Sequence, residues 1–293
     1  MTENSRIPVT VIGGYLGAGK TTLINHLLRH ADGRKLAILV NEFGDLPIDA
    51  DLIETRDENM ITLSGGCVCC SYGSDLSVAL ADLAQSELAP DQIVLEASGV
   101  ALPGSILASI GLMDGFDVDC VVVMADAEKV QELGTHKFLS DTIVRQLEEA
   151  DFLLVNKIDL VDAEQCAALK PWLSGMAPNA TLIETRNAIV DPALIMGTES
   201  TSRIAGENRQ GSAHGHSIPL ETRSYIPEGP VVAEELAQNL ISKHPGLVRA
   251  KGFVETLSGD MATIQIVGKR FSISKAPPSV KPGLVLISLK SGR

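Results

Sequence analysis

The sequence predicts an α/β protein built on a doubly wound, mostly parallel sheet, followed by a small α+β domain. Between residues 8 and 185, short apolar runs alternate with segments of helical period, which is the order of βαβ units. Several of these runs are apolar at every position, as expected for parallel strands covered on both faces. Near residue 191 the composition changes, which indicates that the first domain ends there.

The expected elements of the first domain alternate along the chain. Strands are expected at seven apolar runs, namely Val9–Ile12, Leu36–Val40, Met60–Leu63, Ile93–Leu95, Cys120–Met124, Phe152–Val155 and Thr181–Ile183. Helices are expected over Thr21–His30, Asp75–Glu87, Ile143–Ala150 and Ala163–Leu173. Helices that join parallel strands form right-handed crossovers, so they should cover the faces of the sheet.

The rest of the chain divides into a linker and a second domain. Residues 197–215 are rich in Gly, Ser, Thr, Asn and Arg, which is typical of a flexible segment. We therefore expect a first domain over residues 1–190, a linker over 191–217 and a small domain over 218–293. Within the small domain we expect a helix over Val231–His244. Strands are expected over Ile218–Ile226, Leu247–Glu255, Met261–Val267, Arg270–Ile273 and Leu284–Leu289.

The charge and the terminal sequence bear on location and partners. The net charge of −13 should repel nucleic acid and anionic membranes, so neither is expected as a partner. The chain has no run of 18 apolar residues and no apolar signal core at its start, which favours a cytoplasmic protein. In a reducing compartment, clustered cysteines are expected to bind metal or take part in catalysis. Self-association into a homo-oligomer is left open.

A phosphate-binding loop follows the first expected strand. Residues 14–21 fit the pattern G-x-x-x-x-G-K-[ST], with a strand before the loop and a helix after it. The glycines allow backbone N–H groups to surround phosphate oxygens, Lys20 supplies positive charge, and the Thr21 hydroxyl binds Mg²⁺. The residues expected to contact the nucleotide here are Gly14, Gly17, Ala18, Gly19, Lys20, Thr21 and Thr22.

A guanine-binding motif follows the strand Phe152–Val155. In the sequence N-K-I-D, the Asp159 carboxylate can accept hydrogen bonds from the N1–H and N2–H₂ groups of guanine, which adenine lacks. Asn156 is expected to orient the loop, and the stem of Lys157 to cover the plane of the base. Because the motif lies at a strand end and downstream of a phosphate loop, it predicts GTP as the nucleotide. A P-loop kinase acting on a small molecule would not need this motif.

Two further strand ends supply candidate switch residues. Glu96 ends the strand Ile93–Leu95 and is placed to hold a Mg²⁺-bound water, and the Gly99 backbone N–H could contact the γ-phosphate. The polar segment that begins at Asn41 and Glu42 is the expected first switch. Lys20, Thr21 and Glu96 are the expected catalytic residues, with Thr21 and Glu96 serving Mg²⁺.

Three of the five cysteines, Cys67, Cys69 and Cys70, fall within four positions after the strand Met60–Leu63. The positive end of the following helix would favour their thiolates, which bind Zn²⁺ and related ions rather than Mg²⁺. A tetrahedral site needs a fourth ligand, for which Glu42, Asp49, water and a group on a client protein are candidates. A redox pair and buried structural thiols are the alternatives.

Two histidines, His214 and His216, lie in the expected linker. They could form a weak metal-binding patch or belong to a solvated loop.

Taken together, these motifs resemble the CobW family of metallochaperone GTPases, relatives of the nickel-insertion GTPases of urease and hydrogenase maturation. The resemblance is carried by residues 13–23, 40–44, 66–70, 96–99, 141–147, 150–159 and 249–252. It covers most of residues 7–185 and, more loosely, 218–289. The histidine-rich tract frequent in that family is reduced here to His214 and His216.

The resemblance implies a slow GTPase that binds Zn²⁺ or Co²⁺ at Cys67, Cys69 and Cys70 and delivers it to a client metalloprotein or a cobalamin-type pathway. It also implies that Glu42 joins the metal or Mg²⁺ environment. The alternative is a GTP-gated protein-binding switch in which the zinc is structural and no metal is transferred.

Overall fold

The computed structural model describes residues 6–31, 33–41, 60–65, 80–81, 83, 90–197, 220–244 and 246–290. The chain divides into two compact units, Met1–Ile189 and Val190–Arg293. Each unit contains one sheet of its own. Among the described residues, no helix is both long enough and apolar enough to cross a membrane.

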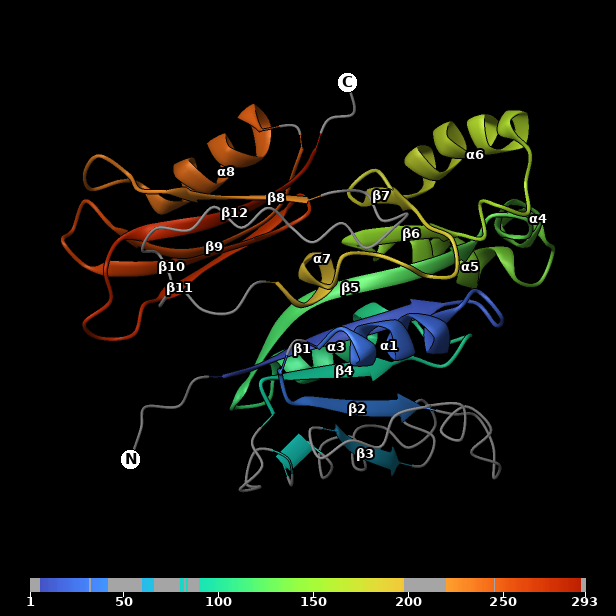
Figure 1. Ribbon diagram of the computed structural model, residues 1–293, viewed down its shortest axis with the longest axis horizontal. Helices are drawn as coiled ribbons and strands as arrows, with labels where there is room; N and C mark the ends of the chain where they lie inside the picture. The colour runs from blue at the N-terminus through green and yellow to red at the C-terminus, as the bar shows by residue number, and fades with distance from the viewer. Residues whose placement is uncertain are drawn as a thin grey trace. The chain divides into compact units, whose positions relative to one another are not determined.

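The first unit contains a parallel sheet of seven strands in the order β3-β2-β4-β1-β5-β6-β7 (Figure 1). This confirms the predicted α/β class, and all seven strands appear where apolar runs predicted them. Their bounds are β1 Ile7–Gly14, β2 Leu36–Asn41, β3 Met60–Gly65, β4 Gln92–Glu96, β5 Phe116–Asp126, β6 Phe152–Asn156 and β7 Thr181–Glu184. Because β1 lies between β4 and β5, the chain segments that follow these three strands are brought to one edge of the sheet.

Helices cover this sheet on both faces. Alternate side chains of β1 point to opposite faces. Val9 and Val11 share one buried cluster with Ile106 and Ile110 of α3, whereas α1 packs on the other face (Figure 1). The bounds are α1 Lys20–Arg29, α3 Pro103–Gly111, α4 Val130–Thr135, α5 Ser140–Glu148 and α6 Ala163–Met176. Within the helix expected over 75–87, Leu80 and Leu83 are helical and buried.

The second unit contains an antiparallel sheet of five strands in the order β11-β10-β9-β12-β8. One face of the sheet is covered by α8, Ala233–Lys243, whose Ala237 and Leu240 pack against Ile264 and Leu286. The strands are β8 Leu220–Tyr225, β9 Leu247–Glu255, β10 Met261–Val267, β11 Arg270–Lys275 and β12 Gly283–Leu289. A small α+β region is therefore present, as predicted, while the domain boundaries drawn from the sequence stay predictions.

One part of the expected linker has a different structure. Pro192–Met196 forms a short helix, α7, whose last three residues are buried. The Asp191 side chain accepts a hydrogen bond from the backbone N–H of Ala193, and Pro192 occupies the first helical position, so the local sequence caps this helix well. A flexible linker over all of residues 191–217 was therefore the wrong expectation for this helix.

Cys166 on α6 provides a test of the packing between α6 and β7. Its thiol donates to Oε1 of Glu184 over 3.3 Å, and Lys170 Nζ lies 2.7 Å from the same oxygen. Burial, and then the hydrogen bond and negative charge of Glu184, raise the pKa of the Cys166 thiol, against a smaller opposing effect of Lys170. Because only the thiolate is nucleophilic, we expect Cys166 to react slowly at neutral pH.

This expectation can be measured as the pH profile of iodoacetamide modification, with the Cys166 peptide followed by mass spectrometry. The rate should keep rising at pH values where a cysteine of the denatured chain has already reached its plateau. A native-state midpoint at or below that of the denatured chain would contradict this account.

Candidate nucleotide-binding site

The phosphate-binding loop connects β1 to α1 at the carboxyl edge of the sheet. Its glycines occupy backbone conformations that other residues rarely adopt, with φ of 124° at Gly14 and 109° at Gly19. A Cβ atom on Gly14 would lie 2.3 Å from the carbonyl oxygen of Met124, so β1 and β5 can approach this closely only with glycine there. Lys20 and Thr21 open α1, which directs the N–H groups of its first turn toward the loop.

Thr21 and Glu96 meet at the start of α1. The Thr21 hydroxyl donates to the Glu96 carboxylate, with Oγ1 lying 3.3 Å from Oε1 and 3.4 Å from Oε2. Glu96 is 3% exposed and ends β4, next to β1. A hydroxyl and a buried carboxylate at this distance offer the oxygen ligands that Mg²⁺ prefers, either directly or through its water molecules. The structure thus brings together the two residues predicted to serve Mg²⁺.

Asn156 joins three segments that are distant in the sequence. Its Nδ2 donates to the carbonyl oxygen of Ala18 in the phosphate-binding loop over 2.9 Å. Its Oδ1 accepts from the Thr185 hydroxyl over 3.0 Å and from the Ala188 backbone N–H over 2.9 Å. Asn156 is buried, and a Cβ on Gly19 would lie 2.5 Å from its Nδ2. The side chain therefore connects the phosphate-binding loop to the segment that follows β7, which is the geometry that the predicted loop-orienting role requires.

The other two residues of the guanine motif lie just beyond β6. Lys157 has a positive φ of 63°, and its Nζ forms an ion pair with Asp126 Oδ2 over 2.7 Å. Asp126 ends β5 and also accepts at Oδ1 from the Glu128 backbone N–H. Asp159 lies in the turn after β6 and is exposed. The carboxylate of Asp159 is thus accessible to a ligand, and Asp126 fixes the end of the Lys157 side chain.

Gly99 lies in the segment between β4 and α3, against the phosphate-binding loop. A Cβ on Gly99 would lie 3.0 Å from the Leu16 backbone nitrogen. This contact brings the strand end after β4 next to the loop after β1.

Several predicted residues lie outside the described part of the chain. They are Glu42, Asp49, Cys67, Cys69, Cys70, His214 and His216. Their roles stay predictions.

Sequence reasoning gave no role to three groups that the structure places at this edge. They are Asp126, the pair Thr185 and Ala188, and Gln146. Asp126 and Thr185 each follow an apolar strand run, and a polar residue at that position is the signal that could have identified them.

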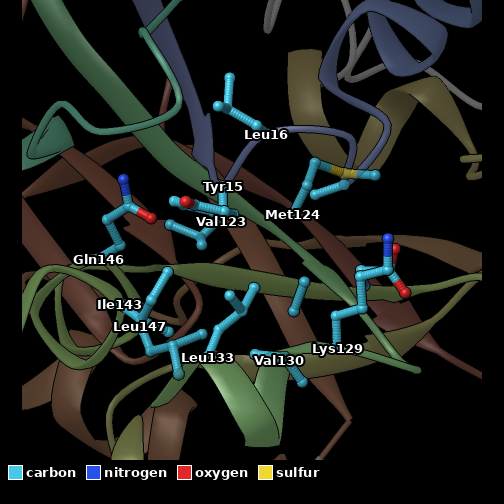
Figure 2. Close-up of a pocket in the computed structure, with 13 residues that line it drawn as sticks. Tyr15, Leu16, Val123, Met124, Lys129, Val130, Leu133, Ile143, Gln146 and Leu147 are labelled. Carbon is cyan, nitrogen blue, oxygen red and sulfur yellow. The ribbon is translucent and has the colours of Figure 1, made fainter. Parts of the chain in front are cut away.

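A small apolar hollow of about 20 Å³, partly open to solvent, adjoins the phosphate-binding loop (Figure 2). Tyr15 and Leu16 contribute from the loop, Leu133 from α4 and Leu147 from α5, with Gln146 and Lys129 at opposite edges. Of the residues predicted to contact the nucleotide, only Ala18 lines it. The hollow therefore neighbours the nucleotide site and is distinct from it.

Known proteins resemble this chain over most of its length. A family model described as "CobW/HypB/UreG, nucleotide-binding domain" matches residues 8–184. The zinc chaperone CobW of Sinorhizobium sp is 32% identical over 312 residues, covering 92% of this chain and 87% of that protein. The zinc chaperone YjiA of Escherichia coli K12 is 32% identical over 200 residues, covering 66% of this chain and 61% of that protein.

A solved structure has the same fold. The crystal structure of Zn(II)-bound YjiA GTPase from E. coli aligns with a TM-score of 0.50 and 22% identity, covering 98% of this chain and 95% of that one. The family model spans more than half of this chain and contains the phosphate-binding loop, Glu96 and the guanine motif. The chain therefore belongs to the CobW/HypB/UreG family of P-loop GTPases.

Proposed function

We propose that this protein is a GTP-dependent metallochaperone that binds Zn²⁺ or Co²⁺ at Cys67, Cys69 and Cys70 and delivers it to a client metalloprotein. Relatives named zinc chaperones support zinc as the cargo. A tetrahedral site with three protein thiolates has a fourth position, which Glu42 or a group of the client could fill. A cytoplasmic location and the lack of a nucleic-acid partner stay predictions.

The proposal rests on the position of the end of β3, which lies at the same edge of the sheet as the end of β4. Gly65, its last residue, pairs with Asn41 of β2, and the preceding residue of β2, Val40, pairs with Glu96. Gly65 is thus two strand spacings, roughly 10 Å, from the strand that supplies Glu96. The cysteine motif starts two residues after Gly65, and Glu42 directly follows Asn41. Both therefore leave the sheet at the edge that carries the nucleotide site.

This placement suggests how hydrolysis would act on the metal. Lys20 would neutralise phosphate charge, Thr21 and Glu96 would hold Mg²⁺, and Asp159 would select guanine. When the γ-phosphate leaves, the segments after β2 and β4 lose a common anchor, so the ligands that converge on the cargo metal would change. A nucleotide can shift metal affinity only if the GTP and GDP states bind the metal differently.

The test is zinc affinity measured by competition with a chromophoric chelator, in the presence of GDP or a nonhydrolysable GTP analogue. We expect at least about a tenfold difference between the two states, which corresponds to about 1.4 kcal/mol of coupling. Equal affinities would overturn the proposal.

Cysteine variants separate transfer from the structural alternative. Cys67→Ser combined with Cys69→Ser should abolish tight zinc binding and leave GTP hydrolysis and folding intact, because a transfer site is not needed for the fold. The matched control is Cys166→Ser on α6, which should keep wild-type zinc affinity. Unfolding of the double variant, or of the metal-free wild type, would instead support a structural zinc.

A further inference from the structure

Side chains of α5 and of the residue that follows it hold the segment between Glu96 and α3, together with the first turn of α3. Gln146 Nε2 donates to the carbonyl oxygens of Gly99 over 3.1 Å and Ala101 over 2.8 Å. Glu149, next after α5, accepts from the Gly104 backbone N–H over 2.7 Å. Three backbone groups of one short segment are therefore bonded to side chains more than 40 residues away in the sequence.

Gln146 is well suited to hold this segment. It is 2% exposed, although it is a polar residue on a surface helix. An amide NH₂ group has two hydrogens, and the two carbonyl oxygens account for both. The amide lies at the edge of the apolar hollow (Figure 2). Because the side chain is almost fully buried, losing these bonds would leave two carbonyls poorly hydrated.

Gly99 lies between this amide and the phosphate-binding loop. On one side its backbone packs against Leu16, where a Cβ would lie 2.7 Å from the Leu16 side chain and 3.0 Å from its backbone nitrogen. On the other side its carbonyl is held by Gln146. The turn is closed by a bond of 2.9 Å from the Ala101 N–H to the Ser98 carbonyl. The Gly99 N–H belongs to the Ser98–Gly99 peptide, whose carbonyl accepts this bond from Ala101. This peptide is therefore fixed through the turn, which Gln146 holds at the carbonyls of Gly99 and Ala101.

We propose that Gln146 is a positioning residue for GTP hydrolysis, which holds the Ser98–Ala101 turn so that the Gly99 N–H meets the γ-phosphate. The inference rests on the proposed role of Gly99 as a γ-phosphate contact. Gln146 itself touches neither nucleotide nor Mg²⁺. It acts by keeping the Ser98–Ala101 turn in the geometry that binds GTP, so its loss should affect the GTP state and spare the GDP state.

The test compares nucleotide affinities of the wild type and Gln146→Met, with Mg²⁺ present and zinc absent. Methionine keeps the length and volume of the side chain and removes both donors. We expect the affinity for a nonhydrolysable GTP analogue to fall about five- to tenfold and kcat to fall about tenfold, while the GDP affinity stays within about twofold. The matched control is Gln131→Met on α4, an exposed glutamine, which should leave all three values unchanged.

A second variant covers the case in which Gln146→Met does not fold. Gln146→Asn keeps the amide and shortens its reach by one methylene, and it should shift the same ratio of GTP-analogue to GDP affinity in the same direction. Equal losses for both nucleotides, or no change in either, would overturn the inference, since a purely structural residue cannot favour one nucleotide state. Failure of zinc coupling in the wild type would overturn the proposed function alone, because these affinities are measured without zinc.

Discussion

Replacing Asn156 with alanine is expected to lower the affinity for GTP and GDP alike, by about one to two orders of magnitude. The buried amide joins the phosphate-binding loop at Ala18 to the Thr185–Ala188 segment, and the variant loses all three hydrogen bonds. The groups left behind are buried, and each unsatisfied one costs about 1–3 kcal/mol. The loss should be the same for both nucleotides because Asn156 contacts a loop used in both states.

Nucleotide titration calorimetry and thermal unfolding would measure this outcome together. The free energy of unfolding should fall by about 2 kcal/mol, which allows for partial rescue by water. Asn179→Ala, in an exposed turn of the same unit, is the matched control and should behave as wild type. A stable Asn156→Ala protein with wild-type affinity for GTP and GDP would show that the nucleotide site does not depend on the hydrogen bonds of Asn156.

Replacing Asp159 with asparagine is expected to change which base the protein accepts. The carboxylate accepts from two donors of guanine, whereas an amide offers one acceptor and one donor. Xanthine carries a carbonyl oxygen where guanine carries its amino group, so it can accept from the new amide. We expect GTP affinity to fall at least about 100-fold and XTP to become the preferred nucleotide.

Competition between fluorescent GDP and unlabelled GTP, XTP or ATP measures this switch directly. Glu164→Gln, an exposed residue on α6 with the same change in charge, is the matched control and should keep the preference for GTP. If Asp159→Asn still prefers GTP over XTP, another group reads the base. The result would not depend on the metal site, so it tests the nucleotide half of the proposed function by itself.

The strands were predictable because a buried parallel strand needs an unbroken apolar run, and their ends shifted by only a few residues. The start of β5 is the clearest exception, since the structure begins it at Phe116 and the apolar run begins at Cys120. Asp119 interrupts the apolar pattern, yet it is buried and accepts from Thr10 on β1 and Gln92 on β4. Its partners come from other strands, so a local pattern could not show that a carboxylate belongs inside the sheet.

The helices were less predictable than the strands. The short helices α3 and α4 were not expected, because α4 has only six residues and α3 has two small residues, Gly104 and Ser105, in its first turn. Tertiary contacts stabilise both helices, and Val130 of α4 is buried in a cluster with Ile143 and Leu147 of α5. Ile106 and Ile110 of α3 pack on β1, and the Gly104 N–H is bonded to Glu149.

The sequence was sufficient for the phosphate-binding loop and the guanine motif, because the chemistry of phosphate and guanine demands particular residues at fixed spacing within one short segment. The tertiary structure alone decided which distant residues complete the site. The hydrogen bond from Asn156 to Ala18 joins residues 138 positions apart in the sequence. The ion pair between Lys157 and Asp126 forms only because β5 and β6 are neighbouring strands. The reason is physical: strand order decides which loops meet at the edge of the sheet, and strand order depends on packing over the whole chain.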